Sequence, residues 1–445
     1  MNKYLVFVIL LFSILLISCN NELMQKNIPE FQSVFKGSIY CKLKVINPPT
    51  CTEYIAGKDN TFLPDGIVLN KIHTDEVATL ADASQAEYFF NQNSFYNSSG
   101  TYSIKVQLGE FKDEPCTDYF SVNFYEQIND ILFVNPFNCG GFISHYNDYL
   151  QKALKTNFLQ TKFYIAKSET TFAQWKEVYD WAIQNGYEIK NSGKPSDTEY
   201  YETAMEDLIL SEEEFSYLGS LPVVDICIYD VLVWLNAFSQ KNNLEQVYYY
   251  KTQSESLVFK NSNSFENFLS IFADNSKNGY RLPTKEEFQF SAHGGLASYA
   301  DFSISSKADD GGVTCLDKND IFKSDFSAVY SGTNDLTALQ NYAVFLENYD
   351  NESVVNAKVL PVCSKFSNSI GLYDMSGNVR EWIFTLDTDK SQNLDYTQIY
   401  YYTVGGSFFD SSLECMINYS VPINSISKDI YTGFRIAKTK QETMN

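Results

Sequence analysis

GLYDMSGNVREW, residues 371–382, is the stretch of this chain that decides its fold. The pair Gly377-Asn378 indicates a tight turn, because glycine adopts backbone conformations that other residues avoid. Trp382 closes the stretch and suits a buried position, since large rings fill the space inside a protein core. The stretch therefore predicts an ordered turn that packs against an aromatic core.

Four more segments of this kind lie on either side of the stretch. In chain order the five segments are FYIAKSETTFAQW (163–175), LPVVDICIYDVLVWLNAF (221–238), NGYRLPTKEEFQFSA (278–292), NSIGLYDMSGNVREW (368–382), and VGGSF with TGFRIAK (404–408 and 432–438). We expect a helix to begin in each of the first three. Thr170 or Thr171 is expected to cap the first and Asp230 the second, and Thr284 with Glu287 forms a capping box at the third.

In this order the five segments resemble the sulfatase-modifying-factor family, the domain of formylglycine-generating enzymes, over residues 131–440. The resemblance implies an α+β fold similar to that of C-type lectins, with small twisted sheets, two helices and much ordered loop. The 32 Tyr and 34 Phe of the chain agree with such a fold, because large rings fill the space between sparse elements. Arg281, in the RLPT segment, is expected to be a structural part of it.

The resemblance places a reaction centre in VGGSFFDSSLECM, residues 404–416. Formylglycine-generating enzymes use two cysteines after Gly-Gly-Ser to hold copper(I) and activate oxygen. The corresponding positions here are Asp410 and Cys415, so only the second thiol is present. Copper(I) is a soft ion that a carboxylate binds poorly. We therefore expect neither copper nor oxidase activity, and Cys415 is a free thiol, a disulfide partner or a core residue.

The chain departs from the family at two more positions. Ile228 stands where a Trp is usual, and Arg380 stands where a Trp is frequent. The related iron-dependent sulfoxide synthases use a cluster of His, which the three scattered residues His73, His145 and His293 do not supply. The departures at Ile228 and Arg380 favour a domain that has the family fold but lacks the full reaction centre.

Four residues are candidates for a ligand groove in this frame: Ser407, Asp410, Cys415 and Arg435. For Arg435, in TGFRIAK, the alternative is a buried ion pair. The groove would take a protein or glycan ligand, as C-type lectin-like surfaces can do.

The resemblance also implies a structural calcium site at the GNVREW loop. By position, its ligands would be Asn378, the carbonyl of Val379 and Glu381. Calcium takes six to eight oxygen ligands, so these three are not sufficient alone. The alternative is that Glu381 pairs with an arginine.

The N-terminus, MNKYLVFVILLFSILLISCNN, predicts export. An apolar run behind one Lys is typical of a signal peptide, here residues 1–18, and is too short to span a membrane. Leu16-Ile17-Ser18-Cys19 resembles the lipobox of bacterial lipoproteins, with Cys19 as the acylated residue. We expect a lipoprotein of the outer membrane or cell surface, and the alternative is an ordinary signal peptide with an incidental Cys.

The region between the anchor and the family domain has the pattern of a β-protein. Residues 19–30 are polar and are expected to form a tether. Residues 31–130 are expected to form a small β-sandwich of the immunoglobulin-like type, because segments such as TYSIKVQL (101–108) alternate apolar and polar side chains.

Charge and cysteine content limit the partners and the chemistry. The formal net charge is −22, which argues against nucleic acid, because binding phosphate requires clustered Lys and Arg. Besides Cys19 there are eight Cys, which an oxidising compartment would allow to form disulfides. The alternative is that they are buried free thiols.

Three functions follow from these observations. The first is a lipid-anchored envelope protein whose family domain binds a ligand or protein without catalysis. The second is a formylglycine-generating or related oxidase that acts on protein cysteine. The third is an accessory subunit of an envelope complex.

Overall fold

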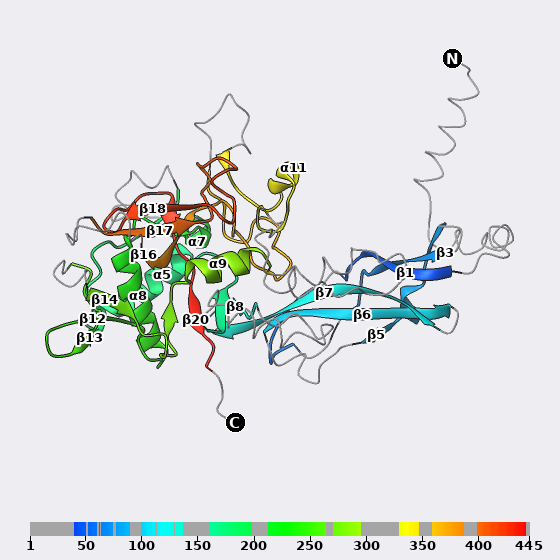
Figure 1. Ribbon diagram of the computed structural model, residues 1–445, viewed down its shortest axis with the longest axis horizontal. Coiled ribbons are helices and arrows are strands. Elements are labelled where there is room, and N and C mark those ends of the chain that lie inside the picture. The colour runs from blue at the N-terminus through cyan, green and yellow to red at the C-terminus, as the bar shows by residue number, and fades with distance from the viewer. Residues whose placement is uncertain are drawn as a thin grey trace, which may run out of the picture. The chain divides into compact units, whose positions relative to one another are not determined.

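The computed structural model describes residues 40–49, 52–59, 62, 64–73, 77–89, 99–111, 114–128, 130–136, 161–197, 212–263, 270–294, 329–346, 358–386 and 398–441. The predicted signal peptide, tether and acylated Cys19 lie outside these residues, as do Cys51, Cys139 and Cys315. Within them the chain is a mixed α/β protein with few helices and many strands (Figure 1). None of the described helices combines the length and the apolarity needed to cross a membrane.

The helices and strands have the following bounds. The helices are η1 (Ala83–Gln85), α5 (Phe172–Gln184), α7 (Glu212–Ser220), α8 (Ile228–Lys241), α9 (Lys285–Ala292) and α11 (Leu336–Leu339). The strands up to the first long helix are β1 (Tyr40–Asn47), β2 (Glu53–Ile55), β3 (Val68–His73), β4 (Ala78–Leu80), β5 (Glu87–Phe89), β6 (Gly100–Phe111), β7 (Glu114–Ile128), β8 (Ile131–Val134) and β9 (Phe163–Ala166). The later strands are β10 (Lys194–Pro195), β11 (Val223–Val224), β12 (Tyr248–Lys251), β13 (Ser256–Val258), β14 (Ile271–Ala273), β15 (Tyr280–Arg281), β16 (Arg380–Leu386), β17 (Tyr400–Val404), β18 (Ser420–Asn424), β19 (Thr432–Gly433) and β20 (Ala437–Thr439).

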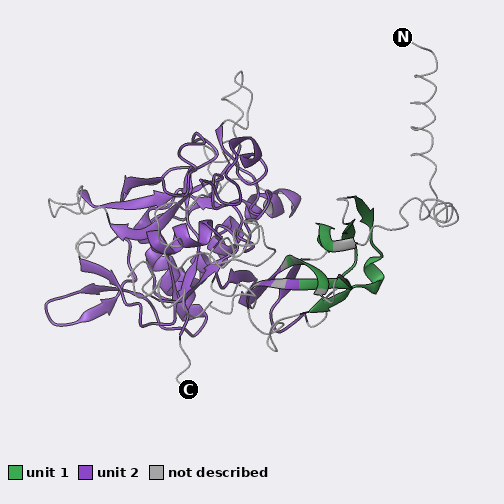
Figure 2. Ribbon diagram, turned by 45° about the vertical axis from the view of Figure 1, so that its right-hand side comes forward, with its two compact units in different colours: residues 1–50, 64–89, 105–120 green, residues 51–63, 90–104, 121–445 purple. Residues whose placement is uncertain are grey.

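The chain divides into two compact units (Figure 2). The first consists of residues 1–50, 64–89 and 105–120, and the second of residues 51–63, 90–104 and 121–445. Strands β6 and β7 contribute residues to both units. The linear boundaries expected from the sequence, 31–130 and 131–440, are coarser than this division.

In the first unit, most of the described residues are in strands, and the short helix η1 lies among them. β1, β3 and β4 form an antiparallel sheet, and β5 pairs antiparallel with β6. In β6, whose residues the two units divide at position 104, the alternation expected for residues 101–108 is confirmed, since Tyr102, Ile104, Val106 and Leu108 are all buried. The immunoglobulin-like topology stays a prediction.

Two sheets organise the second unit. In the first, strands β15, β20, β9, β8 and β7 lie side by side in that order, and β2 pairs parallel with β7. In the second, the order is β18, β17, β16, β19. β19 pairs parallel with the start of β16, so that Arg380 lies opposite Thr432 and Glu381 opposite Gly433. This register places the end of the GNVREW stretch next to the TGFRIAK segment.

Helix α5 begins as expected. Thr171 is its N-cap, and the side chains of Thr171 and Gln174 form a reciprocal capping box. Helix α9 likewise begins after Thr284, whose hydroxyl accepts from the Glu287 backbone while the Glu287 side chain accepts from the Thr284 backbone.

The start of α8 differs from the expectation. Its N-cap is Cys227, not Asp230, and Asp230 is the third helical residue. The Asp230 carboxylate accepts hydrogen bonds from the backbones of Cys227, Lys190 and Asn191 and from the side chains of Asn191 and Ser262. A fully buried carboxylate needs such partners, so Asp230 holds the loop before α8 as well as the helix start.

The core of the second unit is aromatic, as the GLYDMSGNVREW stretch predicts. The ring centroids of Trp175 and Trp234 are 5.5 Å apart and stacked, and Phe434 meets both edge-on. Trp382 is buried in the same cluster. These rings tie α5 and α8 to the TGFRIAK segment.

Glu53, on the short strand β2, forms an ion pair with Lys167 and a hydrogen bond with Tyr373, a residue of the GLYDMSGNVREW stretch. The Glu53 carboxylate accepts from the Lys167 ammonium at 2.8 Å and from the Tyr373 hydroxyl at 2.5 Å. The Lys167 ammonium lies 4.6 Å from the ring centroid of Tyr125 and 4.9 Å from that of Tyr373. Gly371 permits this arrangement, because a Cβ there would lie 2.4 Å from the Tyr125 hydroxyl.

Candidate functional site

Arg380 and Glu381 are adjacent on β16, and each forms an ion pair with a residue of another segment. Side chains of successive strand residues point to opposite faces of a sheet. Glu381 is fully buried, and its two oxygens accept from Nη2 and Nε of Arg435 at 2.6 and 2.7 Å. Arg435 is also fully buried, so the alternative expected for both residues, a buried ion pair, is what the structure contains.

The turn before β16 is held by a second buried carboxylate. Glu169 accepts from the Val379 backbone at 3.0 Å and from the Asn378 side-chain amide at 2.7 Å. Asn378 has a φ of 61°, and the carbonyl oxygen of its side chain accepts from the Leu360 backbone. Gly377 must be a glycine, since a Cβ there would lie 2.3 Å from the Val344 carbonyl oxygen.

These contacts leave few oxygens for the calcium ion expected at Asn378, Val379 and Glu381. Glu381 is engaged by Arg435, and the Asn378 carbonyl oxygen by Leu360. In the part of the chain that the structure describes, no group of three or more His, Cys, Asp or Glu side chains could hold a metal ion. The donor set therefore does not fit calcium, and the calcium site stays a prediction that these contacts do not support.

The interior around Arg435 holds more carboxyl groups than one guanidinium can balance. Burial raises the pKa of Glu169 well above its ordinary value, and the nearby carboxylates of Asp374 and Glu381 raise it further. Burial also raises the pKa of Asp374, to about 6, and that of Glu381, although Arg435 counteracts both shifts. The cluster is therefore sensitive to pH just below neutrality.

The second ion pair occupies the place of the missing thiol. Asp410 accepts from the Arg380 guanidinium through one oxygen and from the Ser407 hydroxyl, at 2.7 Å, through the other. The Asp410 side chain is nearly buried, and Arg380 is about one-fifth exposed, at 21%. Two of the three departures from the family, Asp410 for Cys and Arg380 for Trp, thus contact each other.

Cys415 lies behind this pair in the core. Its side chain is fully buried, and a Cβ on Gly406 would lie 2.7 Å from its Sγ. Its carbonyl accepts from the Ser376 hydroxyl at 2.9 Å. Of the three roles left open for Cys415, burial favours the core residue.

The ligand groove expected at Ser407, Asp410, Cys415 and Arg435 stays a prediction, which the burial of these side chains does not support. Ser407, Cys415 and Arg435 have no exposed surface, because each is used to hold a loop or a strand of the core. Asp410 is 5% exposed. As the structure places them, the four side chains offer almost no surface to a ligand.

The surface next to Asp410 is apolar and aromatic. Phe409, Leu413 and Tyr419 are exposed to 42%, 62% and 40%. The Phe409 ring stacks on that of Tyr431 at 5.4 Å, and the Arg380 guanidinium lies 6.0 Å from the same ring. We call Arg380, Phe409, Leu413, Tyr419 and Tyr431 the loop face. Sequence patterns did not indicate it, because no periodicity marks exposed side chains on an irregular loop.

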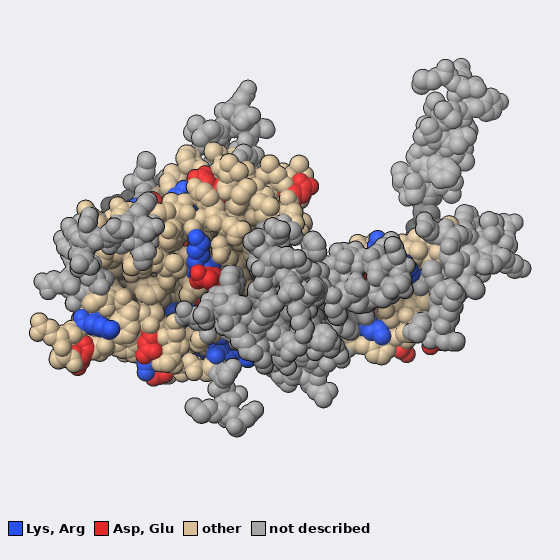
Figure 3. Space-filling view, in the orientation of Figure 1, with Lys and Arg blue, Asp and Glu red and all other residues tan. Residues whose placement is uncertain are grey.

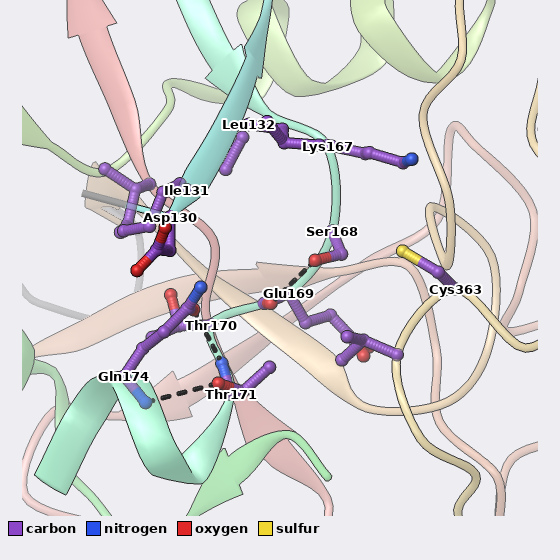
Figure 4. Close-up of a pocket in the computed structure, with 13 residues that line it drawn as sticks. Asp130, Ile131, Leu132, Lys167, Ser168, Glu169, Thr170, Thr171, Gln174 and Cys363 are labelled. Carbon is purple, nitrogen blue, oxygen red and sulfur yellow. Dashed lines mark hydrogen bonds between the residues drawn. The ribbon is translucent and has the colours of Figure 1, made fainter. Parts of the chain in front are cut away.

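A separate cavity of about 220 Å³ lies where β9 leads into α5 (Figure 4). Its lining combines apolar residues with a few polar ones: Asp130, Ile131, Leu132, Ala166, Lys167, Ser168, Glu169, Thr170, Thr171, Gln174, Val362, Cys363 and Ile436. Burial raises the pKa of the Cys363 thiol to about 12, so Cys363 is not a thiolate at neutral pH and is a poor nucleophile.

Comparisons with known proteins give one curated relative and several solved structures that are similar to this chain. Chaperone protein LppX of Paenibacillus barcinonensis is 26% identical over 303 residues, which cover 68% of this chain and 87% of that protein. The crystal structure of CarF is similar with a TM-score of 0.47 and 26% identity, over 63% of this chain and 87% of CarF. Treponema denticola variable protein 1 has a TM-score of 0.41 and 20% identity, over 80% of this chain and 99% of that protein.

A family comparison covers most of the chain. Residues 137–440 match the sulfatase-modifying factor enzyme 1-like domain. This range contains all five segments from which the resemblance was inferred. It also contains the buried Glu381–Arg435 pair and the Arg380–Asp410 pair, whose two residues depart from the family pattern. The chain belongs to the sulfatase-modifying factor enzyme 1-like family.

Proposed function

We propose that this chain is an exported, lipid-anchored protein of the cell envelope whose family domain binds a protein partner and does not oxidise cysteine. The observation that carries the proposal is the contact between Arg380 and Asp410. A carboxylate that already has a guanidinium and a hydroxyl as partners is a poor ligand for copper(I), which prefers thiolates.

The rival function, an oxidase that makes formylglycine from a protein cysteine, needs the thiol chemistry that Asp410 replaces. A carboxylate cannot exchange with a substrate thiol as a thiolate does. Cys415 is fully buried, so a substrate cysteine has no open path to its sulfur. Both points favour binding without turnover.

The composition of the loop face supports a protein as the partner. Protein interfaces are enriched in aromatic residues and Arg and depleted of other charged residues at their centre. The loop face offers Phe409, Tyr419, Tyr431 and Arg380.

The name of the relative in Paenibacillus, a chaperone protein, is compatible with a protein partner. It also keeps the third function, an accessory subunit of an envelope complex, within the same proposal. A glycan ligand is the competing expectation, which the binding experiment below distinguishes.

The catalytic part of the proposal is tested by turnover. Purified protein is given copper(I), oxygen and a peptide with the Cys-x-Pro-x-Arg motif, and mass spectrometry follows the cysteine. We expect no conversion by the wild type or by Cys415→Ala. Conversion by the wild type that disappears in Cys415→Ala would make the oxidase function correct.

The binding part is tested by crosslinking in intact cells. A photo-reactive amino acid replaces Leu413 on the loop face, and in a control chain it replaces Leu257, an exposed residue of β13. We expect one defined protein adduct at position 413 and none at 257. Equal adducts at both positions, or adducts only with glycan, would contradict a protein partner at the loop face.

Lipid anchoring is tested at Cys19. Cys19→Ala should abolish fatty-acid labelling and release the protein from the membrane fraction, because it removes the residue to which the acyl chains of the anchor would be attached. Unchanged retention in the membrane fraction would exclude the anchor. The C-type lectin-like form of the domain and an immunoglobulin-like first unit belong to the same proposal.

A further inference from the structure

The pairing of β1, β3 and β4 in the first unit divides their side chains between two faces. Residues that lie opposite each other in a sheet point to the same face, as do residues two apart along a strand. Two rows of three therefore share one face: Lys42, Ile72 and Ala78, and Lys44, Asn70 and Leu80. The other face is the packed one, because it holds the buried Leu43 and Leu69.

We call the six residues of these two rows the basic face, and half of them or more are open to solvent. Lys42, Lys44 and Ala78 are exposed. Leu80 is exposed to 76%, which is more than any other large apolar residue that the structure describes. The basic face thus combines a solvated apolar side chain with two ammonium groups.

The three strands also differ from the rest of the chain in charge. They contain three Lys and no Asp or Glu, whereas the whole chain has 55 acidic and 33 basic residues. Figure 3 shows Lys and Arg side chains on the part of the molecule where Figure 1 labels β1. Within the described residues, neither Lys42 nor Lys44 has an ion-pair partner. Asp75 and Glu76, between β3 and β4, lie outside those residues.

We propose that the basic face lies on the phospholipid headgroups of the membrane in which the protein is anchored. Lys42 and Lys44 pair with headgroup phosphates, and Leu80 enters the boundary between the headgroups and the acyl chains. The proposal rests on the lipid anchor of the proposed function. It assigns a surface other than the loop face, because no residue of the loop face belongs to these three strands.

The composition of the basic face favours lipid over a protein partner. The centres of protein interfaces are enriched in aromatic residues and Arg and depleted of Lys. The basic face has two Lys and no aromatic residue, which is the reverse of the loop face. Binding to a membrane surface instead grows with the buried apolar area and with the attraction of basic side chains to anionic lipids.

The place of the sheet in the chain brings it to the anchor first. β1 begins at Tyr40 and is the first described element after Cys19, the expected site of acylation. An anchor raises the effective concentration of the attached surface at the membrane, so that even a weak contact is formed most of the time. Two lysines and one leucine can therefore orient an anchored protein, although the formal net charge of the chain is −22.

The experiment places a photo-reactive amino acid at Leu80 of the full, lipid-anchored chain. A control chain carries it at Phe89, an exposed apolar residue of β5 in the same unit. The proteins are reconstituted in vesicles of equal parts phosphatidylglycerol and phosphatidylcholine, and in vesicles of phosphatidylcholine alone. Mass spectrometry first verifies the acyl chains on Cys19 and then measures phospholipid adducts after illumination. A chain without acyl groups shows that the anchor is wrong, and only acylated protein tests the basic face.

We expect phospholipid adducts at position 80, more of them in the anionic vesicles, and few at position 89. Lys42→Gln combined with Lys44→Gln should reduce the adduct at position 80 by about tenfold or more, because each Lys strengthens binding near an anionic surface by about fivefold. Lys105→Gln combined with Lys251→Gln removes the same charge from β6 and β12 and should leave the adduct unchanged. Both double variants should keep the melting temperature of the wild type, since surface substitutions have small effects.

Four results would overturn the proposal. The first is acylated protein that gives no phospholipid adduct at position 80. The second is as much adduct at position 89 as at position 80. The third is a crosslink from position 80 to a second copy of the chain in place of lipid, which would make the basic face an interface between copies. The fourth is an equal loss of adduct in the two double variants, which would show that total charge, and not the basic face, determines the contact.

Discussion

The two ion pairs that begin at Arg380 and Glu381 differ in depth, although their first members are neighbours in the chain. Glu381 and Arg435 are completely withdrawn from water, and each has two hydrogen bonds to the other. Arg380 remains partly in water beside Asp410. Arg380, Glu381 and Arg435 all lie in segments by which the family was identified, but Arg380 and Asp410 are departures from its pattern. The buried Glu381–Arg435 pair stabilises the fold, and the Arg380–Asp410 pair changes which side chains lie near its surface.

The largest effect is expected from breaking the interior pair. Glu381→Gln should lower the free energy of unfolding by about 3–5 kcal/mol, because it removes the one carboxylate that forms both charged hydrogen bonds with the buried Arg435 guanidinium. Chemical denaturation measures this loss, and Glu414→Gln on the surface loop is the control.

The wild type and Glu381→Gln also test whether calcium binds at this turn. If the ion pair is the whole role of Glu381, the melting temperature of the wild type is indifferent to chelator and to added calcium. A rise with calcium that Glu381→Gln removes would instead support a metal at this turn, through the usual stabilisation by ligand binding.

The second effect concerns the interior carboxyl groups. The pKa of Asp374 is raised to about 6 from an ordinary value of 3.8, so the folded protein binds a proton more tightly than the unfolded chain. The stability gained from this proton is complete below about pH 4 and is lost as the pH rises through about 6. The loss is on the order of 2–3 kcal/mol.

Asp374→Asn should therefore flatten the dependence of unfolding free energy on pH between 4 and 7. Asn tolerates the φ of 57° at this position and cannot titrate. Denaturation at a series of pH values measures the slope. An identical slope in Asp374→Asn would show that another group carries the proton.

A smaller effect is expected at the outer pair. Asp410→Ala should lower the free energy of unfolding by only about 1–2 kcal/mol, because the partly exposed Arg380 can be hydrated once its partner is removed. The variant loses the Ser407 contact as well. A cost equal to that of Glu381→Gln would end the distinction between the two pairs.

The smallest effect on stability is expected on the loop face. Leu413→Ser should change the free energy of unfolding by less than about 0.5 kcal/mol, because the side chain is mostly in water. The same change should remove the crosslinked partner of the Proposed function. Lost stability with retained partner binding would mean that Leu413 is a core residue.

Local features of the second unit were predictable from sequence. Thr171 and Thr284 cap their helices as expected, since a cap depends on residues within one turn of the chain. The turn at Gly377-Asn378 and the buried Trp382 were also predicted, because glycine and large rings have strong positional preferences.

Contacts between distant segments were not predictable in the same way. Arg380 and Asp410 are 30 residues apart, and no local pattern indicates that two departures from a family compensate each other. Asp230 was expected to cap a helix by its side-chain type, but burial and five donors from three segments assign it a wider role. Glu169 gave no signal, because its partners lie more than 200 residues away.

The pairing of β2, β7 and β8 with the family sheet has a consequence for recombinant expression. The family match begins at residue 137, yet β9 pairs with β8, where Phe133 lies opposite Ala166 and Val134 opposite Ile165. A clone that starts at residue 137 would leave this edge of β9 without a neighbour and would remove Glu53 from Lys167. Bare strand edges recruit other chains, so the boundary of sequence homology is a poor place to cut this protein. Starting upstream of β2 keeps the sheet closed on that side.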